Sequence, residues 1–473
     1  MKSVCATIGL LAVCAAGAVA QMPAPMPAPV PAPPSFPLVV PPPTSPPATY
    51  DSAPFEGPTS GSTTLRVPRS FSAPYNSPYA ATEGYVDPRG LSRLGGAPGG
   101  CATCSPGGGC FVCGPAGKIW GEIDYILWQA SGDAVPALVT TSPTGTAVGA
   151  AGVLGSTGTR VLAGSSKFSD DLRSGLRYNV GVWLNPEQTI GVQTGGFFLQ
   201  DGSSSAAFSS AGDPILARPF TNALNGAASS QLIAFPGVVG GAIGVDHSNR
   251  IYGFDAALRG NMCCTATWRL DALLGYRFLR IEDNLDINET LTAGAGAPAN
   301  IGVPVGTNVS VADRFQTSNT FNGVQAGVTG EWRFADHWFI SGTGKASFGW
   351  MNQVININGA TAILVPGGAS TQYVGGLLAL SSNMGRSSQT DAVIIPELNV
   401  NLGYQLTSNI RLRAGYSFLY VSSVTRPGSV MDTTVNPALI PPATGTTPAR
   451  PTTLADHNDL FLQGINAGIE VRY

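Results

Sequence analysis

The chain has 473 residues, of which 11% are charged, and its formal net charge is −3. No basic patch occurs in the sequence, which excludes nucleic acid as a partner. After residue 20, no apolar run reaches the ~18 residues of a membrane-spanning helix, so the mature protein is predicted to have none.

Residues 1–20 have the pattern of a cleaved signal peptide. Lys2 gives a positive start, an apolar stretch follows, and Ala18-Val19-Ala20 forms an A-x-A cleavage site. Lipidation at Cys14 is the alternative. The sequence therefore predicts export to the cell envelope.

Residues 21–100 are rich in proline and begin with "QMPAPMPAPVPAPP". Such a segment favours polyproline II and has little apolar surface to bury. We expect a disordered spacer in the periplasm.

Residues 101–116 contain two CxxC pairs in "CATCSPGGGCFVC". The spacing between the pairs is shorter than in zinc sites, and an exported protein meets an oxidising compartment. Two disulfides or a redox-sensitive knot are therefore predicted, with a metal as the alternative. The disulfide candidates are Cys101, Cys104, Cys110, Cys113 and the adjacent Cys263 and Cys264, whose connectivity stays open.

From residue 117 onward, apolar and polar residues alternate in one segment after another. A period of two is typical of strands that have one apolar and one polar face. In "NIRLRAGYSFLY", for example, Leu412 and Tyr416 alternate with Arg411 and Arg413. Ten strands are predicted: 118–127, 172–184, 189–199, 250–260, 265–278, 321–334, 338–350, 396–406, 410–420 and 462–473.

The connections between these strands alternate in length. Four are turns of a few residues ("NPEQ", "NMCC", "ADH" and "TSN"), whereas five are long: 128–171, 201–249, 284–319, 352–390 and 425–458. Short turns at one rim and long loops at the other are typical of outer-membrane barrels. Residues 117–473 are therefore predicted to form an all-β, antiparallel transmembrane barrel of ten strands. Twelve is the alternative if segments such as 352–362 pair within the wall.

Aromatic residues lie near both ends of the predicted strands. Trp268, Trp332 and Trp338 are at the short-turn side, and Phe348 and Trp350 are at the other. Two such girdles are expected at the two membrane interfaces, so the apolar faces should contact outer-membrane lipid. The final strand ends on Tyr473 and resembles the signal that the outer-membrane assembly machinery reads. A secreted β-sandwich binding protein is the alternative.

If the apolar faces meet lipid, the charged residues of the other face line the lumen. These lumen-lining residues are Glu122, Asp124, Arg173, Arg177, Asp255, Arg259, Arg269, Asp271, Arg277, Glu331, Arg333, Lys345, Glu397, Arg411, Arg413, Glu470 and Arg472. Unpaired buried charges are costly, so they must pair or hold water. A ten-stranded lumen is narrow. Two hypotheses follow: a salt-bridged structural plug, or a narrow passage for a small solute or ion.

Several segments together resemble the BBP7 family, planctomycete outer-membrane proteins described as β-barrel porins. They are "CGPAGKIWGEIDYILW", "VPALVTTSP", "RSGLRYNVGVWLNPEQTIGVQTGGFFL", "NINGAT", "PELNVNLGYQLTSNIRLRAGYSFLYVSSVTRPG" and "VNPALIPP". The resemblance covers Cys113 to Tyr473. It implies a porin-like outer-membrane barrel, and neither catalytic residues nor a defined substrate.

The histidines raise the alternative of a hydrolase at the rim, as in omptin proteases. His247 and His457 fall where long loops enter strands and have aspartates nearby, whereas His337 lies in a short turn. A histidine held by a carboxylate can act as a general base, and the same groups could bind a cation. The prediction is nevertheless that the chain is not an enzyme and has no cofactor or metal.

Overall fold

The computed structural model describes residues 117–168, 170–296, 304–443, 445–454 and 456–473. The predictions for the signal peptide (1–20), the Pro-rich segment (21–100) and the Cys-rich segment (101–116) lie outside these residues. Within the described ranges, no helix is both long enough and apolar enough to span a membrane.

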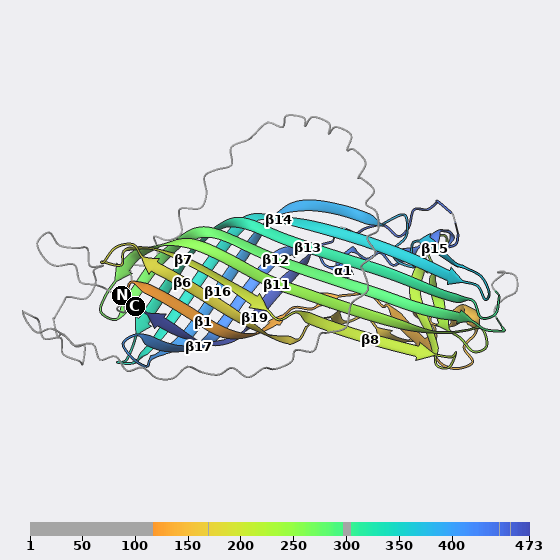
Figure 1. Ribbon diagram of the computed structural model, residues 1–473, viewed down its shortest axis with the longest axis horizontal. Coiled ribbons are helices and arrows are strands. Elements are labelled where there is room, and N and C mark those ends of the chain that lie inside the picture. The colour runs from red at the N-terminus through yellow and green to blue at the C-terminus, as the bar shows by residue number, and fades with distance from the viewer. Residues whose placement is uncertain (1–116, 169, 297–303, 444, 455) are drawn as a thin grey trace, which may run out of the picture. The chain divides into compact units, whose positions relative to one another are not determined.

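Ten antiparallel strands close into a ring (Figure 1). In order they are β1 (Ile119–Ala130), β6 (Leu172–Trp183), β7 (Ile190–Leu199), β11 (Val239–Cys264), β12 (Trp268–Ala293), β13 (Asn308–Arg333), β14 (Trp338–Leu364), β16 (Gly385–Gln405), β17 (Ile410–Val424) and β19 (Asn458–Arg472). The last strand pairs with the first, from Trp120↔Arg472 to Ala130↔Leu462. The predicted antiparallel barrel is therefore confirmed, and the sandwich alternative is wrong.

Two further strands add to the same sheet without entering the ring. β8 (Gly202–Ser210) continues the line of β7 along β11, and β15 (Ser370–Val374) pairs with the far end of β14. The described sheet thus has twelve strands, of which ten make the closed wall. Segment 352–362, which the twelve-strand alternative treated as an extra strand, is instead a continuation of β14.

The outer face of the wall is apolar near the short turns. Leu274 and Val324 are 62% and 65% exposed, while the neighbouring Arg277 and Gln325 are buried inside. This apolar band is about ten residues tall on β12, from Trp268 to Phe278. At ~3.3 Å per residue and ~45° tilt, that is roughly 23 Å, close to the ~25 Å of a lipid-facing band.

Aromatic rings edge the apolar band at both ends. At the short-turn end, Trp338 packs against Tyr404 with ring centroids 5.0 Å apart. At the other end, Tyr178, Phe198, Tyr252 and Phe278 form a continuous row over four neighbouring strands, with successive centroids 6.4, 6.4 and 6.2 Å apart. Such rows are typical of membrane interfaces.

Three of the predicted long loops are in large part strands, so those boundaries were wrong. β12, β13 and β14 each continue for more than a dozen residues beyond the apolar band (Figure 1). The reason is an inversion of the alternation. In "IEDNLDINE", Ile281, Leu285 and Ile287 are fully buried inside, whereas Asn284 and Asn288 face outward. The period of two persists, but the apolar side changes from the outer to the inner face.

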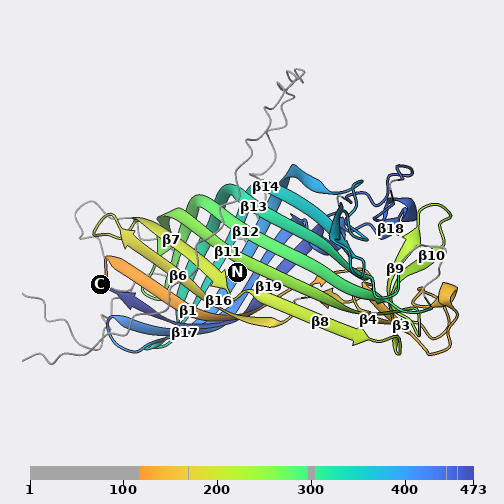
Figure 2. The ribbon, with the colours of Figure 1, turned by 45° about the vertical axis from the view of Figure 1, so that its right-hand side comes forward.

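The inner face of the extended strands is covered by the long-loop segments (Figure 2). These contain a second sheet in the order β10-β9-β3-β4 with β18 beside β9, and the two-stranded pair β2-β5. The bounds are β2 (Asp133–Ala134), β3 (Val139–Ser142), η1 (Val148–Ala150), β4 (Arg160–Ala163), β5 (Lys167–Phe168), β9 (Ile215–Asn222), β10 (Ala228–Ala234), α1 (Pro427–Val430), β18 (Thr434–Val435) and η3 (Pro437–Leu439).

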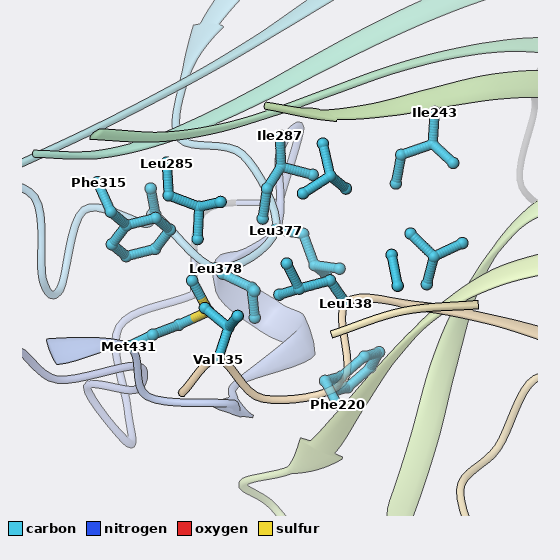
Figure 3. Packing of buried hydrophobic residues seen from close by; sticks show 14 of the residues in the cluster. Val135, Leu138, Phe220, Ile243, Leu285, Ile287, Phe315, Leu377, Leu378 and Met431 are labelled. Atoms are coloured by element: carbon cyan, nitrogen blue, oxygen red, sulfur yellow. The ribbon is translucent and has the colours of Figure 1, made fainter. Parts of the chain in front are cut away.

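The loop segments and the extended strands share one hydrophobic core (Figure 3). Leu377 and Leu378 contribute from one loop, Leu138 from another, and Met431 from a third. All are buried against inward side chains of the wall such as Ile287. The long-loop half of the barrel is therefore packed like the interior of a water-soluble domain.

Candidate functional site: the interior of the barrel

The mouth at the short-turn end is narrowed by stacked aromatic and guanidinium groups. Trp120 and Trp183 pack with ring centroids 5.0 Å apart, and the guanidinium of Arg259 lies 5.1 and 5.2 Å from their centroids. The guanidinium of Arg269 lies 4.3 Å from the ring centroid of Trp183. It donates hydrogen bonds to the side-chain and main-chain carbonyl oxygens of Gln188 in the "NPEQ" turn. This turn thereby packs onto the mouth.

Above the mouth lies a layer of ion pairs that contains sixteen of the seventeen predicted lumen-lining residues. The largest group centres on two arginines of β17. Arg411 bridges Glu331 at 2.8 Å and Glu470 at 3.2 Å, and Arg413 bridges Glu122 at 2.9 Å and Asp124 at 3.0 Å. Arg177, Arg333 and Arg472 complete this group. It ties β1, β6, β13, β17 and β19 together across the lumen.

A second group has two positive and two negative charges. Arg277 pairs with Asp255 at 3.2 Å and with Glu397 at 2.8 Å, and Lys345 pairs with Asp255 at 3.2 Å. All four side chains are at most 14% exposed. The third group is Arg259 and Arg269 on Asp271. Each carboxylate of this layer has a cationic partner, and the nine cationic and seven anionic side chains leave an excess of two positive charges.

The ion-pair layer surrounds a polar cavity of about 110 Å³. Thirteen of the predicted charged residues are among its lining, together with neutral polar residues such as Asn401 and Thr343. Several buried polar atoms around it have no hydrogen-bond partner among the described residues, including Asn179 Oδ1, Gln193 Oε1 and Ser341 Oγ. Such a space fits a small cluster of water molecules.

An apolar layer crosses the lumen above this cavity. Phe197, Phe321, Met351 and Leu279 are among its members, and each is at most 4% exposed. Nine of the ten ring strands contribute; they supply Ile126, Trp128, Ala130, Phe197, Leu199, Ile251, Leu279, Ile281, Phe321, Met351, Val393, Ile395, Leu419, Val421, Val424, Leu460 and Leu462.

The tenth strand, β6, contributes a glycine at this level. A Cβ on Gly175 would lie 2.4 Å from the carbonyl oxygen of Phe198 and 2.9 Å from the Ile126 side chain. The absence of a side chain therefore lets the neighbouring residues fill the layer. Together, the ten strands leave the lumen filled by apolar side chains at this height.

A second polar layer lies beyond the apolar one and joins the loops to the wall. Asp283 of β12 accepts hydrogen bonds from Asn249 at 2.8 Å and from Arg426 at 3.1 Å. Arg426 also donates to the carbonyl of Ser131, so it connects two loops. Arg173, the remaining predicted lumen residue, donates to Asn249. The structure therefore places Arg173 in this layer and not among the ion pairs below, because it lies at the far end of β6.

Asp133 and His247 are buried in the same polar layer. The Asp133 carboxylate accepts the main-chain N–H of Gly428 at 2.9 Å and lies 4.0 Å from His247 Nε2. Burial raises the pKa of Asp133 to about 6; Arg426 opposes this shift, and the carboxylate of Asp283 adds to it. His247 also lies 3.6 Å from Asp283. Asp133 was not among the sequence-predicted residues, because its loop shows no alternation.

The two candidate catalytic histidines are in different surroundings. His247 is 2% exposed and stacks on Phe168, with ring centroids 5.8 Å apart. Its expected position at the rim is therefore wrong, because β11 continues well beyond it. His457 immediately precedes β19 and pairs with Asp391 of β16 at 3.4 Å; both side chains are 36% exposed. No recorded contact joins the two histidines.

A buried ion-pair group that was not predicted from the sequence lies in the core that the loop segments share with the extended strands, here called the upper core. Arg218 of β9 pairs with Asp313 of β13 at 2.6 Å and with Glu289 of β12 at 3.6 Å. Asp313 also accepts main-chain N–H groups of Leu377 and Ala379 at 3.0 and 2.8 Å. Asp313 thereby holds the loop after β15 against the wall. The strict alternation in "VADRFQT" could have indicated that Asp313 and Phe315 share one face.

Cys263 and Cys264 are both disulfide-bonded. The other candidates, Cys101, Cys104, Cys110 and Cys113, lie outside the described residues. Among the residues that the structure does describe, no group of three or more His, Cys, Asp or Glu side chains could hold a metal ion.

Comparison with solved structures finds outer-membrane barrels at low identity. The outer membrane protease OmpT from Escherichia coli is 14% identical, with 75% of this chain and 97% of that chain covered and a TM-score of 0.36. A deletion mutant of TodX, a monoaromatic hydrocarbon channel, is 8% identical, with 76% and 91% covered and a TM-score of 0.21. OmpT of Vibrio cholerae is 10% identical, with 75% and 98% covered and a TM-score of 0.12. No curated protein matches the chain.

A family model gives the assignment. The model described as "Putative beta barrel porin-7 (BBP7)" matches residues 120–473, from the first strand of the ring to the last. This match covers three quarters of the sequence and agrees with the closed antiparallel ring. The chain therefore belongs to the BBP7 family of porin-like β-barrels.

Proposed function

We propose that this protein is a sealed outer-membrane barrel with a structural role in the membrane. The apolar band and its two aromatic rows fit a bilayer, with the short turns in the periplasm and the extended strands outside the cell. Lipid is then its main partner. The final strand, β19, is the candidate for contact with the assembly machinery.

The observation that carries this proposal is the apolar layer across the lumen. An open porin lumen is polar and water-filled. Here apolar side chains from nine strands close the path, and they also fill the space beside Gly175, which has no side chain. The ion-pair layer and the mouth around Trp183 and Arg269 add two further barriers. Ion pairs between five strands also rigidify the wall, which suits a structural component.

Conductance in a planar bilayer tests the proposal. The wild-type protein is expected to give no conductance steps. The triple variant Phe197→Ala, Phe321→Ala, Met351→Ala should stay silent as well, because the core of the long-loop half still fills the barrel beyond the apolar layer. The variant Ile287→Ala, Phe315→Ala, Ile357→Ala removes similar volume from the core of the long-loop half and should also stay silent, because the apolar layer is intact.

Two results would contradict the proposal. One is rapid passage of disaccharides through liposomes that carry the wild-type protein. The other is conductance by the folded variant Ile287→Ala, Phe315→Ala, Ile357→Ala, which would mean that the intact apolar layer does not close the lumen. Circular dichroism of both variants checks that the barrel is intact.

We also propose that the chain has no catalytic role. The hydrolase alternative needs a histidine, a carboxylate and further groups at one accessible place. His247 is enclosed within the polar layer, and His457 has Asp391 as its recorded carboxylate partner. Hydrolysis of unstructured peptides by the purified protein, lost in His457→Ala, would contradict this.

A further inference from the structure

The outer face of the extended strands is polar and continuous with the apolar band. On β12 the outward series passes directly from Tyr276 and Phe278 to Arg280, Glu282 and Asn284. The polar face therefore begins at the aromatic row, and on β12 it continues for about fourteen residues, which is ~33 Å of height at the strand tilt. In the proposed orientation, it stands in the layer just outside the lipid headgroups.

The side chains of this face form rows in register across the sheet. One row joins Ser203 of β8, Ser248 of β11, Asn284 of β12, Gln316 of β13 and Asn356 of β14. Within it, Asn284 donates to Ser248 at 3.4 Å and Asn356 donates to Gln316 at 3.0 Å. Five strands at a spacing of ~4.8 Å give a platform about 20 Å wide.

The charges on this face balance. Arg250 pairs with Asp201 at 2.8 Å, Arg280 pairs with Glu282 at 2.6 Å, and Arg314 pairs with Asp286. Asp246 and Arg386 add one exposed charge of each sign. The complementary partner is therefore neutral.

We infer that this face binds the saccharide part of glycolipids in the outer leaflet. Amide and hydroxyl groups both donate and accept hydrogen bonds, which is also the property of sugar hydroxyls. Continuity with the lipid-facing band places a glycolipid's acyl chains on Leu274 and its sugars on the row above. This inference rests on the proposed outer-membrane location.

The test uses the full chain in phospholipid liposomes with or without a diacyl glycolipid whose saccharide is uncharged. The thermal unfolding midpoint should rise when this uncharged glycolipid is present, and amides of β12 and β13 above the aromatic row should exchange more slowly. The variant Asn284→Ala, Gln316→Ala, Asn356→Ala should lose most of this rise. The matched control Ser370→Ala, Thr371→Ala, Gln372→Ala on exposed β15 should keep it.

The outcomes separate the inference from the proposed function. Failure of the wild-type protein to insert into plain liposomes, measured by quenching of tryptophan with lipid-attached quenchers, would overturn the membrane location. Normal insertion with no rise, or an equal rise in the row variant, would overturn the saccharide site alone. An equal effect of soluble, lipid-free polysaccharide would also overturn it, because the sugar would then be recognised without its lipid.

Discussion

Replacement of Asp255 is expected to be among the most destabilising single changes in the lumen. The side chain is 5% exposed and is the recorded carboxylate partner of Lys345, at 3.2 Å. Arg277 keeps a second partner, Glu397, at 2.8 Å. Asp255→Asn therefore leaves Lys345 as the unpaired member, while the amide preserves the size of the side chain.

The magnitude follows from the burial of the pair. At an effective dielectric constant of about 20, opposite charges 3.2 Å apart attract by roughly 5 kcal/mol. Removing one partner of a buried ion pair typically costs about 3–5 kcal/mol, since the other charge stays desolvated. We expect Asp255→Asn to lower the free energy of unfolding by that amount. The double change Asp255→Asn, Lys345→Met should recover most of the loss, because the four-charge group becomes neutral again.

The assay is urea unfolding of the liposome-inserted protein, followed by tryptophan fluorescence. Lys345→Met alone completes the double-mutant cycle. A loss below about 1 kcal/mol for Asp255→Asn would refute the argument that this charge pair is desolvated. A double variant no more stable than Asp255→Asn would refute the assignment of Lys345 as the stranded charge.

Further predictions concern the wall, the apolar layer and the loops. Leu412→Arg on the lipid-facing side should lower the free energy of unfolding by ~2–4 kcal/mol, whereas Ser318→Arg above the aromatic row should change it by no more than ~0.5 kcal/mol. Equal losses for the two variants, measured by unfolding in liposomes, would contradict the position of the apolar band. Gly175→Ala should cost ~1–3 kcal/mol through overpacking, and Gly260→Ala, with no atom within 4 Å of its added Cβ, should cost less; thermal unfolding of both variants checks this order. The pKa of Asp133 is raised to about 6 from 3.8, so its burial destabilises the folded loops above pH 6 and this penalty disappears as the pH falls toward 3.8. The protection factors of amides in the loop around it, which compare the measured exchange rate with the intrinsic rate at the same pH, should therefore be larger near pH 4 than at pH 8. Asp133→Asn should remove that difference; an unchanged profile in the variant would count against the assignment.

The barrel itself could be predicted from the sequence because its signal is local. In the strand that contains Arg411 and Leu412, apolar and polar residues alternate and aromatic residues lie near the strand end. This pattern depends only on which face of the strand meets lipid. Turn lengths then fix the antiparallel order without any distant contact. The charged residues of the lower lumen follow from the same parity, since one strand residue in two must face inward.

The apolar layer across the lumen and the core that the loops share with the extended strands could not be predicted in this way. Ile287 and Phe315 face inward in the inverted half only because loops from distant parts of the chain cover them. Arg173 has the same parity as Arg177, yet its height along β6 places it in a different layer with Asn249. Sequence alone determined the lipid-facing part of the wall and the side of each residue there, because strand periodicity is local. Only the tertiary structure decided which height each side chain occupies and which partner it meets there, because height depends on the register between strands and on the loops that fold inside.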